Sequence, residues 1–446
     1  MKSRRFTIAL VIAFFFSFWR GAQAITLDTV LDGTLERNPA IQQAKANLEE
    51  AAGQRLVLRS IMWPSVRAGV PAGVQGGHRA GSNSTIVFAF ARGSFTQPLF
   101  HAAIPPSLRL GDVDLLIAEQ QLNLAVMQQL HAARLTFYSA LYNRGLQSIR
   151  EEERKRLDEN AASQKDRYEA GLSDRGAFTS ATVQARELDA QIEGASRAYA
   201  EARMKLAMAM GDTLGDGATI PEPEGELQSR PVIVDLEAET KTALEKRADL
   251  KLARLLVRAA NEQQRIVEAG YYPAVAGTLQ GDYIPVSGAN AVHREGSTRR
   301  TDDFDGSEAR EGTVYTWQVV DNGKVAGAVI KQRKAKEINE VAVRKLEANI
   351  GGELLRIRND LAAIEARQKS LGGALAIGEQ NASAVRQNLL GGVVSELEYR
   401  LAENSFLEIK SGLLTASYQY NIAMAEWDRA TGRYFQFSND TTPNVH

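Results

Sequence analysis

The chain has 446 residues, including 53 Lys or Arg, 54 Asp or Glu, five His and no Cys. This near balance of charge provides no basic surface for nucleic acid, so we exclude that class of partner. The absence of Cys excludes thiol catalysis, disulfides, cysteine-ligated metals and a cysteine-linked lipid anchor. No two His stand at helical metal-ligand spacing, and no cofactor motif is present, so no cofactor is expected.

The first 24 residues have the pattern of a secretory signal peptide. Lys2, Arg4 and Arg5 precede an apolar stretch from Phe6 to Trp19, and the small residues of Ala22–Ala24 provide a cleavage site. The alternative, a transmembrane anchor, is weaker because the apolar stretch is shorter than the roughly 20 residues that span a bilayer. Cleavage removes four basic and no acidic residues, which lowers the net charge from −1 to −5.

Helix and strand patterns follow in order. A helix is predicted from about Leu27 to Met62, where Pro64 stops it. Strict alternation of Val or Ala with Arg, Gly or Pro predicts a strand at about 65–75, and an apolar, aromatic stretch predicts a second at about 85–96. Residues 76–84, rich in Gly and polar side chains, are predicted to form the loop between them.

A helical hairpin is predicted next, at about 105–210. The stretch from about Ser107 to Arg167 contains no Pro and would form a helix about 90 Å long at 1.5 Å per residue. Pro105 and Pro106 precede it, so this helix should begin at or after Pro105. A turn at Gly171–Asp174 connects it to a return helix.

The same order then occurs again. The second copy is predicted to contain strands at about 274–285 and 312–320, a polar loop at 287–311 and a helical hairpin at about 323–431. We therefore divide the chain into a first repeat at 25–220, a linker at 221–234, a second repeat at 235–435 and a C-terminal tail at 436–446.

Matched residues support this duplication. At an offset of 209, Leu35-Glu36-Arg37 corresponds to Leu244-Glu245-Lys246, and Trp63-Pro64 corresponds to Tyr272-Pro273. The offset then becomes 221, as shown by Gly171 and Gly392, Tyr199 and Tyr420, and Gly211 and Gly432. The second copy is therefore 12 residues longer between these matches, and the extra residues lie in its polar loop, because surface loops tolerate insertions.

The strands raise the question of a membrane pore. After the signal peptide no apolar run reaches 18 residues, so no helix is predicted to span a bilayer, whereas each strand has the length of a tilted membrane strand. Four strands are too few, because single-chain barrels begin at about eight. The strands are therefore either soluble hairpins or parts of a barrel shared by several chains. The signal peptide and the long helices favour sharing, and the predicted fold class is mainly α with a membrane β-barrel.

Several local motifs, in this order and partly doubled, resemble the TolC-type outer-membrane efflux protein (outer membrane factor) family. They are Leu35-Glu36-Arg37-Asn38-Pro39, Thr96-Gln97-Pro98-Leu99-Phe100, Tyr168-Glu169-Ala170-Gly171, Trp317-Gln318-Val319 before Asp321-Asn322-Gly323-Lys324, and Gly392-Val393-Val394-Ser395 before Leu397-Glu398. The resemblance implies a homotrimer with a 12-stranded barrel in outer-membrane lipid and a long α-helical periplasmic tunnel. It also implies a periplasmic adaptor (membrane fusion protein) and an inner-membrane pump of the RND or ABC type as partners.

The resemblance also assigns candidate residues. The adaptor-contact tips map to Ala170, Gly171, Leu172, Gly391, Gly392 and Val393; the alternative is that these residues only end helices. The pore constriction maps to Glu398 and Leu401, so a trimer would carry three carboxylates that favour cations, unless Glu398 is an ordinary surface residue. Val394 and Ala177 replace the charges expected in a closed-state latch, which leaves Tyr168 and Asp174 as possible polar gate contacts.

Strand alternation assigns two faces to the predicted barrel. The lipid face should carry Val66, Val70, Val74, Tyr315 and Trp317, and the lumen face Arg67, Gln280 and Asp282.

Three functions remain. The favoured one is a passive exit duct for efflux or type I secretion, with efflux preferred and no enzymatic activity. A periplasmic adaptor-like coiled-coil protein is the alternative, although two hairpins exceed what an adaptor needs. A periplasmic enzyme is disfavoured because no catalytic constellation is found.

Overall fold

The computed structural model describes residues 24–79, 82–212, 220, 222–227, 235–284 and 306–433. The tail and most of the predicted signal peptide and linker lie outside this range. The chain forms two compact units. The first, which we call the helical unit, contains residues up to 46, 120–251 and those from 345 onward. The second, the sheet unit, contains 47–119 and 252–344.

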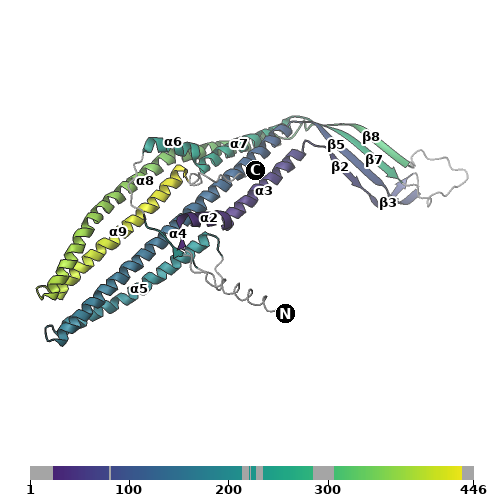
Figure 1. The fold of residues 1–446 in the computed structure, drawn as a ribbon. Coiled ribbons are helices and arrows are strands. Elements are labelled where there is room, and N and C mark those ends of the chain that lie inside the picture. The colour runs from purple at the N-terminus through teal and green to yellow at the C-terminus, as the bar shows by residue number, and fades with distance from the viewer. Residues whose placement is uncertain are drawn as a thin grey trace, which may run out of the picture. The chain divides into compact units, whose positions relative to one another are not determined.

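The helical unit is built around two long hairpins. The first consists of α4 (Ile104–Glu169) and α5 (Arg175–Ala209), and the second of α8 (Lys324–Leu390) and α9 (Glu396–Thr431) (Figure 1). α4 and α8 begin in the sheet unit and end in the helical unit. The short helices α2 (Leu27–Arg37) and α6 (Leu236–Lys246) and a parallel pair of two-residue strands, β1 (Ala24–Ile25) and β6 (Glu222–Pro223), complete the helical unit.

Small and aromatic side chains fill the core of the helical unit. One buried cluster joins α2, α4, α5 and α9 through Val30, Ala133, Phe137, Tyr138, Ala140, Leu141, Ala202, Leu206, Met210 and Ala425. Ala is frequent at these positions because a small side chain allows neighbouring helices to approach closely. Within the described residues, no helix is both long and apolar enough to cross a membrane.

The single helix predicted from Leu27 to Met62 is wrong in one respect: the structure divides it into α2 and α3 (Pro39–Ser60). Asn38 between them is extended, with φ −64° and ψ 123°, and Pro39 has no N–H to continue the helical ladder. The Asn38 carboxamide oxygen accepts a bond from the Ala40 amide at 2.9 Å, which restarts the helix. The second copy is broken at Arg247, between α6 and α7 (Ala248–Glu268), without a Pro.

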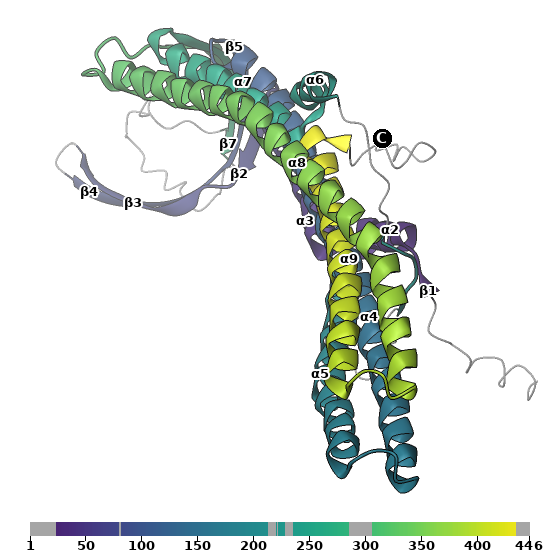
Figure 2. The ribbon, with the colours of Figure 1, turned by 90° about the vertical axis from the view of Figure 1, so that its left-hand side faces the viewer.

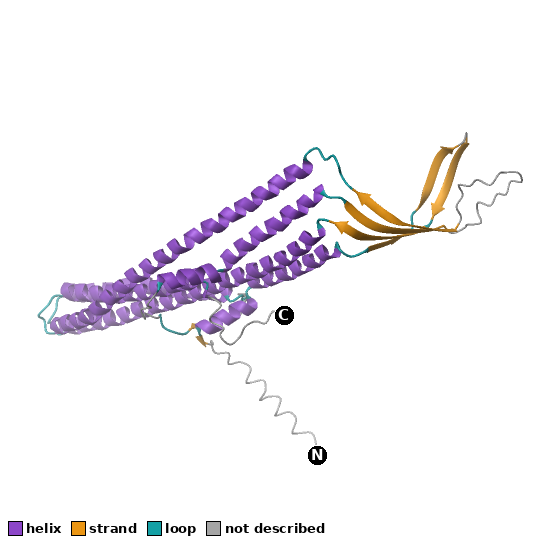
Figure 3. Cartoon of the chain, turned by 90° about the horizontal axis from the view of Figure 1, so that it is seen from above, coloured by secondary structure: helices purple, strands orange, loops and turns teal. Residues whose placement is uncertain are grey.

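The sheet unit contains a four-stranded antiparallel sheet in the order β2-β5-β7-β8. The strands of the chain are drawn in orange in Figure 3. Its strands are β2 (Ser65–Gly69), β5 (Ala91–His101), β7 (Ala274–Ile284) and β8 (Gly306–Thr316). β3 (Ala72–Arg79) and β4 (Ser82–Ala89) form a separate two-stranded sheet, and a 3₁₀ turn (Ala269–Tyr271) precedes β7.

The first two strands differ from the prediction of single strands at 65–75 and 85–96. Each is divided, the first at Val70–Pro71 and the second at Phe90, whose amide donates to the Pro71 carbonyl at 3.1 Å. The loop predicted at 76–84 is also wrong for most of its length, because Gly76–Arg79 pairs with Ser82–Thr85. Composition indicated a turn there, but backbone pairing does not require apolar side chains.

The last strand was predicted six residues too late. β8 begins at Gly306 rather than at about 312 and ends at Thr316 rather than 320, because it pairs with β7 over the whole length of that strand, from Ile284 opposite Gly306 to Ala274 opposite Thr316. Residues 306–311, predicted as loop, are therefore strand; the rest of that predicted loop lies outside the described residues. The hairpin ends lie within two residues of the predicted ones, and α4 starts at Ile104 with Pro105 in its first turn, where a missing amide costs little.

Candidate functional site

The two hairpin tips, which point in the same direction within the helical unit (Figure 2), have the same backbone turn. Gly171 and Gly392 both have φ of +74°, which side chains other than Gly rarely adopt. The amide after each Gly reaches back five residues: Leu172 donates to the Arg167 carbonyl at 2.8 Å and Val393 to that of Asn388 at 2.9 Å. These Schellman turns end α4 and α8, so the capping role considered for the tip residues holds.

The turns also present apolar side chains to solvent. Leu172 is 73% exposed and Val393 is 77% exposed, and the turn uses only the backbone amide of each residue to make its hydrogen bond. Leu390, Leu397 and Leu401 near the second tip are exposed as well. The backbone of each turn ends a helix, and the exposed apolar side chains of the turn are available to a partner.

The helices that follow the turns are capped differently. In the first tip the Asp174 carboxylate accepts a bond from the Ala177 amide at 2.6 Å. In the second, Ser395 and Glu398 form a reciprocal capping box: the Ser395 hydroxyl accepts from the Glu398 amide at 3.3 Å, and the Glu398 carboxylate accepts from the Ser395 amide at 2.7 Å. Glu398 therefore has a structural role at its own helix end, and its side chain stays exposed, as does Leu401.

The two predicted polar gate residues have partners inside the first hairpin. Tyr168 stacks on Phe178, with ring centroids 6.2 Å apart and planes 11° apart. Asp174 caps α5, as described above. The contacts of these two residues do not bring them to Glu398 or Leu401.

Arg167 joins the two tips, which sequence reasoning did not foresee. Its guanidinium, at the end of α4, donates to the carbonyls of Leu389 at 3.2 Å and Leu390 at 2.7 Å, at the end of α8. These carbonyls belong to the last turn of a helix, where no intrahelical amide is available to them. A basic residue in a last turn normally caps its own helix, so the sequence alone gives no sign that Arg167 caps another one.

Behind the tips, polar contacts continue between the hairpins. Glu396 accepts bonds from Asn160 at 2.6 Å and Gln164 at 3.3 Å, and burial raises its pKa. Arg156 of α4 donates to Glu403 of α9 at 2.9 Å, where the Glu403 side chain is only 5% exposed.

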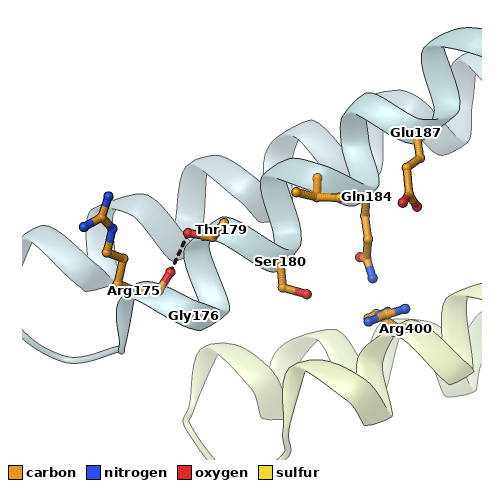
Figure 4. Close-up of a pocket in the computed structure, with 8 residues that line it drawn as sticks. Arg175, Gly176, Thr179, Ser180, Gln184, Glu187 and Arg400 are labelled. Atoms are coloured by element: carbon orange, nitrogen blue, oxygen red, sulfur yellow. Dashed lines mark hydrogen bonds between the residues drawn. The ribbon is translucent and has the colours of Figure 1, made fainter.

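A groove of about 640 Å³ lies between α5 and α9 in the same region (Figure 4). Its lining includes Arg175, Thr179, Gln184 and Glu187 of α5 and Arg400 of α9, and the Gln184 and Arg400 side chains point toward each other across it. Among the described residues, no group of three or more acidic or His side chains is arranged to hold a metal ion.

The four-stranded sheet has two chemically different faces, because residues that face each other across an antiparallel pair lie on the same side. We call one the polar face; it carries Ser65, Arg67, Arg92, Ser94, Thr96, Thr278, Gln280, Asp282, Glu308 and Arg310. The other, the apolar face, carries Val66, Ala68, Ala91, Phe95, Leu279, Tyr283, Ala309 and Tyr315. The separation has exceptions: Gln97, Ser307, Glu311 and Thr313 lie on the apolar face, and Val314 lies on the polar face. Arg67, Gln280 and Asp282 thus lie opposite Val66 and Tyr315, as the alternation predicted.

Other residues predicted for the lipid face lie elsewhere. Val70 and Trp317 follow the ends of β2 and β8, and Val74 belongs to β3. Trp317 instead belongs to a group of exposed aromatic residues at the end of the sheet where β2 and β7 begin and β8 ends, which we call the base of the sheet. The group consists of Trp63, Tyr271, Tyr272, Tyr315 and Trp317. The indole N–H of Trp317 donates to the Tyr271 carbonyl at 3.3 Å.

Both edges of the sheet are open within the part of the chain that the structure describes. β2 pairs only with β5, and β8 pairs only with β7. The sequence predicted four strands but could not show which of them are edges.

Comparison with known proteins gives one family. Residues 30–212 match the family model described as outer membrane efflux protein. This segment covers most of the first repeat and less than half of the chain. Among curated proteins, no sequence matches the chain significantly.

Solved structures match nearly the whole chain. The outer membrane protein VceC of Vibrio cholerae is 18% identical, with a TM-score of 0.77 over 91% of this chain and 96% of VceC. The CmeC outer membrane channel of Campylobacter jejuni is 14% identical, with a TM-score of 0.74 over 91% and 85%. The open state of the MtrE channel of Neisseria gonorrhoeae is 15% identical, with a TM-score of 0.72 over 91% and 88%. The chain therefore has the fold of outer-membrane efflux channels, which confirms the predicted resemblance and the mainly α fold class, while the trimeric 12-stranded barrel stays a prediction.

Proposed function

We propose that this chain, which has the fold of outer-membrane efflux channels, is the outer-membrane exit duct of a tripartite export system. It passively conducts solutes from the periplasm to the outside and catalyses no reaction. The observation that carries this proposal is the four-stranded sheet with a polar face, an apolar face and two open edges. A sheet of this kind is stable in lipid only when its edges are paired and its apolar face is turned outward.

The open edges support a homotrimer, the number of copies that the resemblance implies. Pairing β8 of one copy with β2 of the next would close three sheets into a 12-stranded barrel. The helices that lead to these edges also have uncovered apolar side chains, which include Leu56 and Val57 of α3 and Ile330 and Ile338 of α8. These side chains would be covered if neighbouring copies pack side by side.

The aromatic group at the base of the sheet supports insertion into outer-membrane lipid. Trp and Tyr collect where the hydrocarbon region of a membrane meets water, because their rings are apolar and their N–H or O–H groups are polar. Trp63 and Tyr272, which are 64% and 60% exposed, lie just before β2 and β7. This position suits the periplasmic boundary of the barrel.

The exposed tips are the proposed contacts with a periplasmic adaptor, which in turn binds an inner-membrane pump. The candidate residues are those predicted from the sequence: Ala170, Gly171, Leu172, Gly391, Gly392 and Val393. The apolar side chains of Leu172 and Val393 would supply most of the contact area, and the two Gly would let the partner approach the backbone. Efflux is favoured over protein secretion because the matching family model is one of efflux proteins.

The test of the duct is its assembly and location. Membrane fractions of cells that express the chain should contain it in the outer membrane. After extraction in mild detergent it should migrate as a trimer that becomes a monomer on heating. A soluble periplasmic monomer would contradict the proposal and favour the adaptor-like alternative.

The proposed constriction at Glu398 needs a test that separates charge from capping. Glu398→Gln removes the carboxylate but keeps an acceptor for the Ser395 amide, because Gln also completes a capping box. We expect this variant to lose cation preference in planar bilayers while its thermal stability changes little. The reciprocal variant Ala177→Glu puts an acid at the matching position of the first tip and should increase cation preference. If neither variant changes the reversal potential, these positions do not line the constriction.

A further inference from the structure

The polar face carries more guanidinium groups than carboxylates. Arg67, Arg92 and Arg310 lie on it together with only two acids, Asp282 and Glu308. Glu311, the next acid along β8, lies on the opposite face, in register with Leu279. The polar face therefore has a net charge of +1 per chain.

Both acids of this face are already engaged. Arg92 holds Asp282 through two parallel bonds, Nε to Oδ1 at 2.8 Å and Nη2 to Oδ2 at 3.0 Å. Arg310 donates from Nε to Glu308 at 2.5 Å. These pairs place opposite charges next to each other, so their fields largely cancel at a distance.

Arg67 is different. It lies on the edge strand β2, is exposed, and faces Ser94 of β5 and then Gln280 of β7 across the sheet. Its guanidinium has no hydrogen-bond or ion-pair partner among the residues that the structure describes. A guanidinium with its donors free matches the two oxygens of a carboxylate or phosphate group.

We propose that Arg67 makes the sheet region of the duct selective for anionic solutes, by attracting carboxylate or phosphate groups to the wall of the pore. This inference rests on the proposed function, because it requires the polar face to line the lumen. In a trimer the three Arg67 side chains would stand at equivalent positions around the axis, which strengthens the preference. The barrel would then select solutes by charge independently of the hairpin tips, where Glu398 is the proposed determinant of cation preference.

The absence of Cys allows a direct measurement of the potential at this place. Ser94→Cys puts one thiol beside Arg67 on the polar face of the assembled protein. Its reaction rates with an anionic and a cationic methanethiosulfonate reagent of similar size are compared in outer membranes. Adding Arg67→Gln should lower the ratio of anionic to cationic rate roughly fivefold, as expected for loss of a unit charge about 8 Å away in water. The matched control is Glu311→Gln, which changes charge by one unit on the opposite face and should leave the ratio unchanged.

The outcomes separate the inference from the proposed function. A thiol at position 94 that reacts with neither reagent would show that the polar face does not line a water-filled lumen, which overturns both. A reactive thiol whose rate ratio is unchanged by Arg67→Gln would overturn the anion preference and leave the duct intact. Asp282→Asn, which frees Arg92 from its partner, should raise the ratio, and a fall would also contradict the inference.

Discussion

The two hairpin tips have the same turn but different side chains around it. Both use a Gly with φ of +74° and a bond that reaches back five residues. The first tip then has a single cap, Asp174, and sends Arg167 to the other hairpin, whereas the second has the Ser395–Glu398 capping box and the half-buried Glu396. Duplication therefore preserved the backbone, while the polar contacts diverged, so the tips should respond differently to matched substitutions.

The largest effect is expected below the tips, where the hairpins are joined. Arg156→Met should destabilise the protein by about 3 kcal/mol, because it leaves the buried Glu403 carboxylate without its cation. Thermal unfolding of the detergent-solubilised protein measures this loss. The control Arg197→Met removes an exposed pair with Glu193 and should change stability by less than about 0.5 kcal/mol. Equal effects of the two variants would mean that the Arg156–Glu403 pair does not join the hairpins.

Arg167 gives the clearest test of the asymmetry. Arg167→Gln should weaken the end of α8 by about 1.4 kcal/mol, because the Leu389 and Leu390 carbonyls lose a charged donor. This corresponds to roughly tenfold faster protease cleavage at the second tip, while cleavage at the first tip changes less. Asn388→Gln, at the matching position of the second hairpin, is the control. Faster cleavage at the first tip alone would contradict the prediction, because it would mean that Arg167 stabilises the end of its own helix, α4, rather than the end of α8.

The helix caps should give a smaller and more symmetrical effect. Asp174→Ala and Ser395→Ala each remove an N-cap, and each should cost about 1 kcal/mol. Hydrogen exchange at the first turns of α5 and α9 measures the fraying of each helix separately. Each variant should speed exchange only in the first turn of its own helix. Faster exchange in the other hairpin as well would contradict this prediction and would show that the caps also link the tips.

The smallest effect concerns pH and only the second tip. Burial raises the pKa of Glu396 above its ordinary value of 4.5, so the folded protein binds this proton more tightly than the unfolded chain does. The stabilising contribution is complete below pH 4.5 and is lost as the pH rises through the raised pKa. Glu396→Gln keeps an acceptor for Asn160 and removes this dependence, which should amount to less than about 1 kcal/mol. Melting temperatures of wild type and variant, compared from pH 4 to 7, should diverge as the pH rises; parallel curves would contradict the prediction.

Sequence reasoning was most successful where local chemistry decides the structure. The Gly-containing turns and the ends of the long helices follow from residues within a few positions of each other, and strand alternation correctly separated Arg67 from Val66. The breaks at Asn38 and Phe90 were missed, because a regular pattern on both sides of a break gives no reason to divide an element. The extent of β8 was missed because its partner, rather than its composition, sets its ends.

The contacts that tie the site together lie beyond sequence reasoning for a different reason. Arg167 and Leu390 are 223 residues apart, and Arg156 and Glu403 are 247 apart. Each of these charged residues also has an ordinary role available on its own helix, as an exposed side chain or a local ion pair. Only the placement of the hairpins side by side selects the distant partner.

The two open edges of the sheet are unequal in length. β8 offers 11 residues and β2 only five, because Pro71 ends β2's ladder and redirects the chain into β3. If copies join edge to edge, β2 can match less than half of each β8, and the remainder must be covered by another segment or left exposed. The seam between copies would therefore be the weakest line of the wall, and the place where a newly made subunit is most prone to pair wrongly before the ring is complete.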